Sequence, residues 1–467
     1  MFLSWWRKWL NRLQPTRPIR RSRPKKRRCR QLDLEVLEDR TVPSAVSLLG
    51  IPKWEEQGPG PITNGFASGI PDQPQVGATN AVAVDPHNPD HVFAATVDGG
   101  IWGTSHFTAA SPDWTPLTDQ LPSLAVGDIE FSPLDPTGNT VFAATGDFSN
   151  DLGDSNPSTG VLKTIDGGKT WTQLGQSTLG GLDIQRIVPT ARIDTGVGPG
   201  RGGQIVLAAT VENNGLFRST DGGITWTQIS GSDGSHDGID NNGDGRIDEA
   251  GELDLPAGGV RDVQADPGNN LRFYAALPAQ FDNKGVLTQP GGVFRSEDGG
   301  LTWRTVSNGV AGIANAVMVK LAVHNSATNA VYAAVIDPVF DMKGNLTQTK
   351  LAGVSRSTDQ GGTWKPIGPG SLPDTNPGMQ YGNFALAADP GDANIVFVSG
   401  DAGTMNNFRG DAGADTWTSV AFDGASGTAP HPDSRSLVFD SSGPNRVLIE
   451  TNDGGIYRLF HPHNDPA

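Results

Sequence analysis

The sequence predicts an all-β fold, a seven-bladed β-propeller closed by its N-terminal strand, and three observations support this prediction. A short apolar strand, which ends in Ala-Ala in most copies, recurs seven times along the 467 residues. A tryptophan recurs at the start of another short strand, and 61 glycines and 34 prolines supply turns between the many strands. Short, evenly spaced strands with frequent turn residues are typical of sandwiches, barrels and propellers, and a repeating unit favours the propeller.

The second strand of each repeat can be followed through the chain. It lies at residues 91–96, 141–145, 205–210, 272–276, 330–334, 395–399 and 446–450. Most copies are preceded by a strand that ends in a turn, as at Asp85-Pro86 and Asp389-Pro390. Because proline after aspartate favours a tight turn, the first and second strands are predicted to form hairpins.

The outermost strand of six repeats begins with a tryptophan, at Trp114, Trp171, Trp226, Trp303, Trp364 and Trp417. The seventh repeat has an apolar strand at residues 455–460, but no such tryptophan follows it. Trp54, in the segment 54–59, is the predicted substitute. A strand from the front of the chain that completes the last sheet leaves no free edge in the ring. Residues 51–467 are therefore predicted to form one propeller, with an insertion at residues 230–259.

An eight-residue turn recurs in four repeats, before the outermost strand. Residues 219–226 read Ser-Thr-Asp-Gly-Gly-Ile-Thr-Trp, and closely similar segments occur at residues 164–171, 296–303 and 357–364. An aspartate in a tight turn accepts hydrogen bonds from the backbone N–H groups that follow it, and glycine adopts a positive φ without steric cost. Each copy is therefore predicted to be a hairpin turn that its aspartate fixes and its tryptophan anchors.

These turns resemble the Asp-box, or BNR repeat, of sialidases, related glycoside hydrolases, sortilin-type (VPS10-like) receptor domains and many bacterial propellers. The resemblance implies a structural role for the box aspartates, so Asp166, Asp221, Asp298 and Asp359 are not predicted to be catalytic. Function is expected on the opposite face, in loops carried by a rigid scaffold. The long connections on that face are residues 146–159, 230–259, 277–291 and 336–353.

Charge is distributed unevenly along the chain. Residues 1–30 hold twelve Lys and Arg and no acidic residue, whereas the rest of the chain holds the other 23 basic and all 51 acidic residues. A strongly acidic folded part argues against nucleic acid as its partner and is compatible with cation binding. Cys29 is the one cysteine, so a disulfide within a single chain is excluded.

Residues 1–49 are predicted to form a basic, disordered leader. They contain no apolar run long enough to span a membrane. Residues 34–44, Leu-Glu-Val-Leu-Glu-Asp-Arg-Thr-Val-Pro-Ser, resemble a leader signature at the start of many bacterial surface and secreted proteins. This resemblance implies a secreted or cell-surface protein. The alternative is a basic head that touches membrane lipids or nucleic acid.

The insertion at residues 230–259 contains a candidate calcium loop. Oxygen ligands at positions one, three, five, seven and nine, with glycine at six, match what Ca²⁺ requires in a tight loop. The loop is similar to those of EF-hand, dockerin and thrombospondin type 3 repeats, although its twelfth position is Gly251 in place of glutamate. The alternative is a solvated acidic loop. The predicted ligands of a structural Ca²⁺ ion are Asp237, Asp240, Asn242, Asp244, the carbonyl of Arg246 and Asp248.

A second candidate site lies at the start of the seventh repeat. Residues 431–437 are similar to an H-x-D-x-H-x-L stretch of some Asp-box propellers, with arginine in place of the second histidine. These side chains are predicted to bind an anionic or hydroxylated ligand, or a metal with the help of Asp453. The alternative is a hydrogen-bonded strand entry. The predicted ligand-binding residues are His431, Asp433, Arg435, Asp453, Arg186, Arg261 and Tyr381.

Two classes of function remain open from the sequence, and no catalytic pair can be assigned. A sialidase needs three arginines, a tyrosine nucleophile and an acid catalyst, but the F/Y-R-I-P signature of that family is missing. Xyloglucanase-type hydrolases place two catalytic acids on two facing propellers, and this chain has one. We therefore predict a non-catalytic, extracytoplasmic, calcium-stabilised propeller, a monomer that binds a glycan or another cell-surface polymer. The alternative is a glycoside hydrolase of sialidase or xyloglucanase type.

Overall fold

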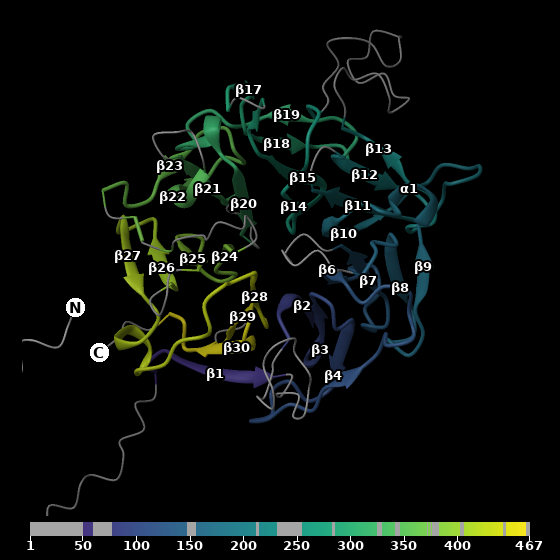
Figure 1. Ribbon diagram of the computed structural model, residues 1–467, viewed down its shortest axis with the longest axis horizontal. Coiled ribbons are helices and arrows are strands. Elements are labelled where there is room, and N and C mark those ends of the chain that lie inside the picture. The colour runs from purple at the N-terminus through teal and green to yellow at the C-terminus, as the bar shows by residue number, and fades with distance from the viewer. Residues whose placement is uncertain are drawn as a thin grey trace, which may run out of the picture. The chain divides into compact units, whose positions relative to one another are not determined.

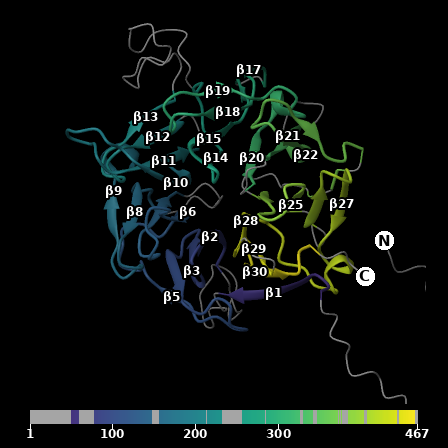
Figure 2. The ribbon, with the colours of Figure 1, turned by 180° about the vertical axis from the view of Figure 1, so that it is seen from behind.

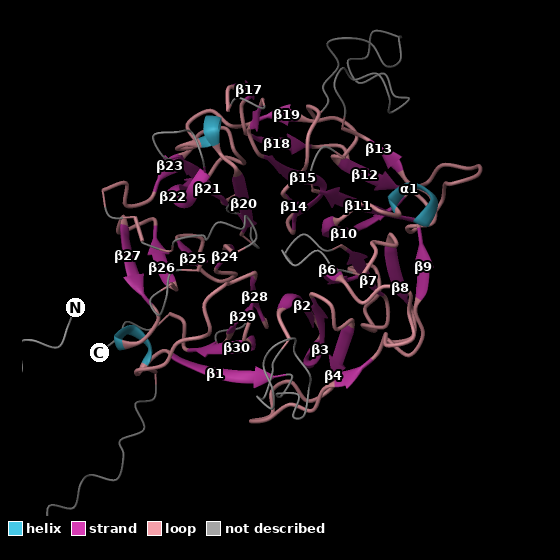
Figure 3. Cartoon of the chain, in the orientation of Figure 1, coloured by secondary structure: helices cyan, strands magenta, loops and turns pink. Residues whose placement is uncertain are grey.

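The structure is a computed structural model built almost entirely of β-strands (Figure 3). The described residues all belong to one compact unit, residues 50–467. The leader (1–49), the predicted calcium ligands (237–248) and Tyr381 lie outside the described residues. The structure describes residues 50–58, 77–146, 156–211, 214–230, 255–282, 285–324, 329–340, 346–370, 372–373, 375, 383–401, 406–441 and 445–463.

The described strands form four-stranded antiparallel sheets that follow one another around a common centre (Figures 1 and 2). Sheet one joins β2 (Thr79–Asp85), β3 (Asn88–Thr96), β4 (Ile101–Thr104) and β5 (Thr115–Pro116). Sheet two joins β6 (Val126–Phe131), β7 (Val141–Thr145), β8 (Val161–Thr164) and β9 (Thr172–Leu174). Sheet three joins β10 (Ile184–Ile193), β11 (Gln204–Thr210), β12 (Leu216–Ser219) and β13 (Thr227–Gln228). Sheet four joins β14 (Asp262–Asp266), β15 (Asn269–Leu277), β18 (Gly292–Ser296) and β19 (Arg304–Thr305).

Three further sheets continue the series. Sheet five joins β20 (Met318–Val323), β21 (Val331–Phe340), β22 (Leu346–Ser357) and β23 (Lys365–Pro366). Sheet six joins β24 (Ala385–Ala388), β25 (Ile395–Ser399), β26 (Phe408–Asp411) and β27 (Thr416–Ser419). Sheet seven joins β28 (Ser436–Phe439), β29 (Leu448–Asn452), β30 (Gly455–Phe460) and β1 (Lys53–Gly58). The short helices are α1 (Gln176–Leu179) and the 3₁₀ turns η2 (Ile313–Asn315) and η3 (Asp423–Ala425).

The first strand of each sheet, called the inner strand below, contacts the inner strands of the neighbouring sheets, and β28 also contacts β2. The predicted second strands are confirmed as β3, β7, β11, β15, β21, β25 and β29. Their small and apolar side chains are buried, as Phe93, Ala94 and Ala95 show in β3. Alanine at these positions leaves room for the close packing of one sheet against the next.

Strand β1 is the outermost strand of sheet seven, as the position of Trp54 predicts. Trp54 lies opposite Leu459 of β30, and its indole is 3 % exposed. The indole Nε1–H donates to the carbonyl of Val420, which follows β27 in sheet six, at 2.7 Å. On the other side, the indole of Trp114 donates to the carbonyl of Gln57 in β1 at 2.9 Å. Strand β1 therefore joins residues of sheets six and one as well as completing its own sheet.

The aspartate turns have the predicted hydrogen bonds. Asp221 Oδ1 accepts the N–H groups of Ile224 and Thr225 at 3.0 and 2.9 Å, and Oδ2 accepts the hydroxyl of Thr225 at 2.6 Å. Gly222 and Gly223 have φ values of 78° and 97°, which other residues rarely adopt. The threonine of each turn donates in the same way to Asp166, Asp298 and Asp359. All four aspartates are thus occupied by their own turns.

Two of the long connections that were predicted as loops are partly strands. Residues 277–291 include a hairpin of β16 (Gln280–Phe281) and β17 (Leu287–Gln289). Residues 336–353 extend the pairing of β21 and β22, with Ile336 opposite Leu351 and Val339 opposite Gln348. The reason is local, since Thr347 and Thr349 are β-branched and such residues are favoured in strands.

Candidate functional site

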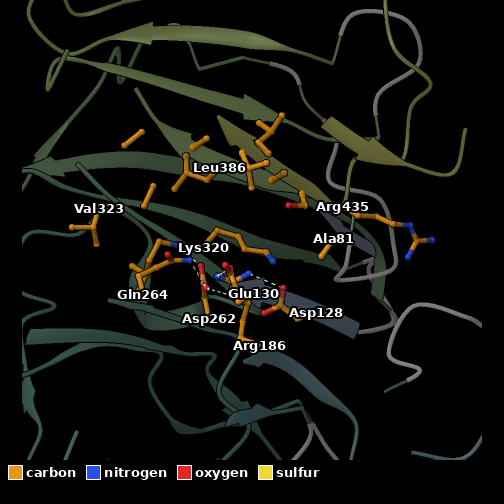
Figure 4. A pocket seen from close by; sticks show the side chains of 18 of the residues that line it. Ala81, Asp128, Glu130, Arg186, Asp262, Gln264, Lys320, Val323, Leu386 and Arg435 are labelled. Carbon is orange, nitrogen blue, oxygen red and sulfur yellow. Dashed lines mark hydrogen bonds and ion pairs between the residues drawn. The ribbon is translucent and has the colours of Figure 1, made fainter. Parts of the chain in front are cut away.

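A cavity of about 280 Å³ lies at the centre of the ring (Figure 4). Residues of all the inner strands β2, β6, β10, β14, β20, β24 and β28 line it. One part of the wall is charged and another part is aliphatic, so the cavity is chemically two-sided. The charged lining residues are Asp128, Glu130, Arg186, Asp262, Lys320 and Arg435.

Four of these charges alternate in sign on successive inner strands. Asp128, Arg186, Asp262 and Lys320 lie opposite Ala144, Ala209, Ala276 and Ala334 of the adjacent second strands, which is the same register position in each sheet. Because one face of every inner strand lines the cavity, this shared position gathers the four side chains in one layer. Figure 4 shows them side by side.

Arg186, a predicted ligand-binding residue, is surrounded by carboxylates. Its guanidinium lies 3.1 Å from Asp128, 3.4 Å from Glu130 and 3.5 Å from Asp262. These neighbours raise the pKa of Arg186 although burial lowers it. A ligand carboxylate would therefore have to compete with three carboxylates of the protein for this arginine.

The carboxylates of the layer also connect neighbouring sheets. Asp128 Oδ2 accepts the N–H of Ile187 in β10 at 2.8 Å, and Asp262 Oδ2 accepts the N–H of Leu321 in β20 at 2.8 Å. Burial raises the pKa of Asp128, with Arg186 acting in the opposite direction. Burial also raises the pKa of Glu130 to about 7. The layer therefore has a structural role besides any binding role.

A second group of polar side chains lies where connections of sheets six and seven meet. Arg435 precedes β28, and its guanidinium lies 2.7 Å from Asp453 in the turn between β29 and β30. The same guanidinium donates to the side chain of Asn80 in β2 at 3.0 Å. Arg435 thus links this group to the central cavity, which it also lines. We call Asn383, Asp401, Asp433, Arg435 and Asp453 the acidic site.

Asp401 and Asp433 form a carboxyl pair within the acidic site. The N–H of Ser434 donates to the carbonyl of Gly400 at 3.2 Å, which brings the two aspartates together. Burial, a hydrogen bond to Asp433 and the charge of Asp433 raise the pKa of Asp401 to about 7. Asn383 Nδ2 donates to Asp433 Oδ1 at 2.7 Å. One carboxyl of the pair therefore keeps its proton close to neutral pH.

The predicted ligand-binding residues fall into separate groups in the structure. Asp433, Arg435 and Asp453 lie together, and His431 is an exposed neighbour whose Cβ lies beside Gly454. Arg186 lies in the cavity instead. Arg261 precedes β14 and is half-buried. Its backbone N–H donates to the carbonyl of Ala276 at 2.9 Å. Tyr381 is outside the described residues, so its prediction remains open.

Sequence reasoning missed Asp401, Glu130 and Lys320. Asp401 directly follows the second strand of the sixth repeat, on the face where ligands were expected, so its position was a usable signal. To predict that Glu130 and Lys320 line the cavity, one would need the register of the inner strands, which the apolar pattern of the sequence does not reveal. Among the described residues, no group of three His, Cys, Asp or Glu side chains is arranged to hold a metal ion. No helix in the described part of the chain is long and apolar enough to cross a membrane.

Comparison with known proteins points to glycan-degrading enzymes. No family model matches the chain. A xyloglucanase of Paenibacillus sp. is 25 % identical over 356 residues, which cover 72 % of this chain and 30 % of that enzyme. A xyloglucanase of Acetivibrio thermocellus is 29 % identical over 227 residues, which cover 46 % of this chain and 24 % of that enzyme. The chain thus spans less than a third of the length of these curated relatives.

Two solved structures resemble this chain in fold. The GH74 xyloglucanase of Xanthomonas campestris matches with a TM-score of 0.53 and 19 % identity, over 87 % of this chain and 53 % of that one. An ancestral GH74 enzyme matches with a TM-score of 0.52 and 16 % identity, over 87 % and 46 %. These likenesses support a β-propeller. The curated relatives favour the glycoside hydrolase alternative, and the prediction of a non-catalytic protein is not supported.

Proposed function

We propose that this chain is the propeller of a glycoside hydrolase that acts on β-linked glucans of the xyloglucan class. The observation that carries the proposal is that the acidic site holds one carboxyl with a raised pKa of about 7, Asp401, together with Asp453, which is paired with Arg435. Glycosidases need one carboxyl that is protonated at working pH and one that is not, and different surroundings of two carboxyls produce that difference. The similarity to xyloglucanases supports the substrate class.

In this proposal Asp401 is the general acid. It gives its proton to the glycosidic oxygen as the bond between that oxygen and the anomeric carbon breaks. A water molecule adds to the anomeric carbon, and its proton passes to a second carboxylate. Asp433 is too close to Asp401 to leave room for that water, because the two carboxyls of inverting enzymes are about 6.5–9.5 Å apart. Asp453, which Arg435 holds in place, is the proposed acceptor.

Release of reducing ends from xyloglucan tests this function. The wild-type chain is expected to be active, and Asp401→Asn should lower kcat by about a hundredfold or more, as loss of a general acid does. Activity should fall as the pH rises through about 7, because Asp401 must be protonated. The exposed Asp119 provides a control, and Asp119→Asn should leave kcat unchanged. Full activity of Asp401→Asn would contradict the assignment.

A glycan-binding module is the second candidate. It is favoured by the length of the chain, which spans less than a third of the curated xyloglucanases, so a complete catalytic pair need not lie within it. Retardation in gels that contain xyloglucan, with no release of reducing ends, would identify this case. The other features that go with either function remain proposals, namely an extracytoplasmic location, a monomeric state and a propeller of seven blades that β1 closes.

Calcium binding by the insertion 230–259 also remains a proposal. A cluster of five oxygen donors in an acidic loop is stabilised when a cation relieves the repulsion between its carboxylates. EDTA is therefore expected to increase proteolysis within residues 233–255, and Asp244→Ala should have the same effect in the presence of calcium. Titration calorimetry should show one site, and binding should stabilise the folded form by about 2.7 kcal/mol at a hundredfold excess over Kd. A digestion pattern unchanged by EDTA would leave a solvated acidic loop.

A further inference from the structure

Lys320 is a charged group of the central cavity that the proposed hydrolysis does not use. It lies on β20 at the same register position as Asp128, Arg186 and Asp262. Among the residues that the structure describes, no acceptor lies within hydrogen-bond or ion-pair distance of its ammonium group. Burial lowers the pKa of Lys320, with the charge of Asp262 acting in the opposite direction. Among the described residues, this ammonium group therefore makes no hydrogen bond and no close ion pair.

Two neighbouring carboxylates, Asp262 and Asp128, have both of their oxygens bonded to other groups. Asp262 Oδ1 accepts the side-chain amide of Gln264 at 2.9 Å and lies 3.5 Å from Arg186. Its Oδ2 accepts the N–H of Leu321. The two oxygens of Asp128 likewise accept hydrogen bonds, one from Arg186 and one from the backbone N–H of Ile187 in β10. The layer therefore pairs Arg186 with carboxylates on neighbouring strands, whereas Lys320 makes no such close pair among the described residues.

The other side of the cavity is aliphatic. Strands β24 and β28 contribute Leu386 and Leu437 at the register position of the charged layer, together with Ala385, Ala387 and Val438. Figure 4 shows Leu386 across from the side chains of Asp262 and Glu130. Apolar walls with one or a few polar groups are typical of small-molecule sites. An occupant must therefore present a small anionic group to one side and an apolar body to the other.

We propose that the central cavity binds a small aliphatic carboxylate, whose head group accepts hydrogen bonds from Lys320 and whose body packs against Leu386 and Leu437. A carboxylate supplies the opposite charge to the half-buried ammonium group, and such charge-assisted hydrogen bonds are stronger than neutral ones. A volume of about 280 Å³ accommodates a short chain such as hexanoate. Arg435 borders both this cavity and the acidic site, but Lys320, Leu386 and Leu437 are not part of the acidic site, so substitutions at these three positions test the carboxylate site separately.

Titration calorimetry with sodium hexanoate tests the proposal, at constant ionic strength and at neutral pH. The wild-type chain is expected to show one saturable site. Acetate should bind more weakly because it cannot reach the aliphatic wall, and hexylamine should not bind because it carries the wrong charge. Lys320→Met is expected to weaken hexanoate binding by about tenfold or more, as the loss of a charged hydrogen bond does. The exposed Lys365 gives a matched control, and Lys365→Met should bind as the wild type does.

Two further variants keep the test decisive if Lys320→Met does not fold. Lys320→Arg keeps the charge and should retain binding within a few-fold. Leu386→Ala should weaken the binding of hexanoate but not that of acetate. Absence of saturable heat with wild-type protein, or equal affinity of Lys320→Met and the wild type, would overturn the proposal. Equal binding of hexanoate and hexylamine would overturn it as well, because binding would then not depend on the ammonium group.

Discussion

Trp54→Ala is expected to lower the free energy of unfolding by about 3–5 kcal/mol, as other large truncations in protein cores do. The side chain is 3 % exposed and packs with Phe397, Leu448 and Leu459. The substitution also removes the hydrogen bond from its indole to Val420 and leaves that buried carbonyl without its donor. Chemical denaturation followed by circular dichroism measures the change.

Lys53 provides the matched control for this experiment. It lies next to Trp54 in the same strand, but its side chain is exposed and pairs only with Glu55. Because surface ion pairs contribute little, Lys53→Ala should change stability by less than about 1 kcal/mol. Equal effects of the two substitutions would mean that β1 is not part of the packed ring. Deletion of residues 51–58 should then also leave the melting temperature unchanged.

Glu450 is expected to make the protein less stable as the pH rises from about 5 to about 8. Its side chain is fully buried on β29, and it is held by Ser399, Asn407 and Asn452 rather than by a basic residue. Burial raises its pKa to about 8. The folded state therefore keeps a proton that the unfolded state releases above its ordinary pKa of 4.5. The contribution of this bound proton to the free energy of unfolding is fully present below about pH 4.5 and is lost as the pH rises through about 8.

Glu450→Gln isolates this contribution because glutamine has the same shape and does not titrate. The variant and the wild type should be similarly stable at pH 5. At pH 8 the variant should be more stable, by up to about 4 kcal/mol, since the cost of keeping the carboxyl neutral grows by about 1.4 kcal/mol per pH unit. Glu56→Gln, a change at an exposed position, should show no such difference. A difference between Glu450→Gln and the wild type that is constant with pH would show that Glu450 does not titrate as proposed.

The repeated strands and their turns could be predicted because they depend on local patterns. The Ala-Ala strands, the aspartate turns and the substitution of Trp54 for a seventh tryptophan are all visible in short segments of the sequence. Each segment satisfies its own hydrogen bonds or buries its own aromatic ring, so the pattern and the structure agree. The proximity of Arg435 and Asp453 was also expected, since both belong to neighbouring turns of one repeat.

The remaining site residues depend on contacts between repeats, which no short segment contains. The pKa of Asp401 is raised because the side chain is buried and because Asp433, which precedes β28, lies beside it. Both oxygens of Asp262, the carboxylate whose charge acts most on Lys320, accept hydrogen bonds from other groups. Glu450 lies in a strand whose sequence shows nothing unusual, and the groups that donate hydrogen bonds to it come from Asn407 and Ser399, at strands of sheet six. Such relations follow from the arrangement of sheets in space.

The position of strand β1 has a consequence for the order in which the protein folds. Trp54 donates its indole hydrogen bond to Val420, 366 residues further along the chain, and β1 pairs with β30 beyond that. During synthesis this segment is made long before its partners, and it cannot pair until the sheets between them in the sequence have been made. Contacts so distant in sequence form slowly, and an unpaired strand is prone to pair with other chains in the meantime. The pairing of β1 therefore joins a segment that is made early to segments that are made late. We expect this pairing to be a late and slow step of folding.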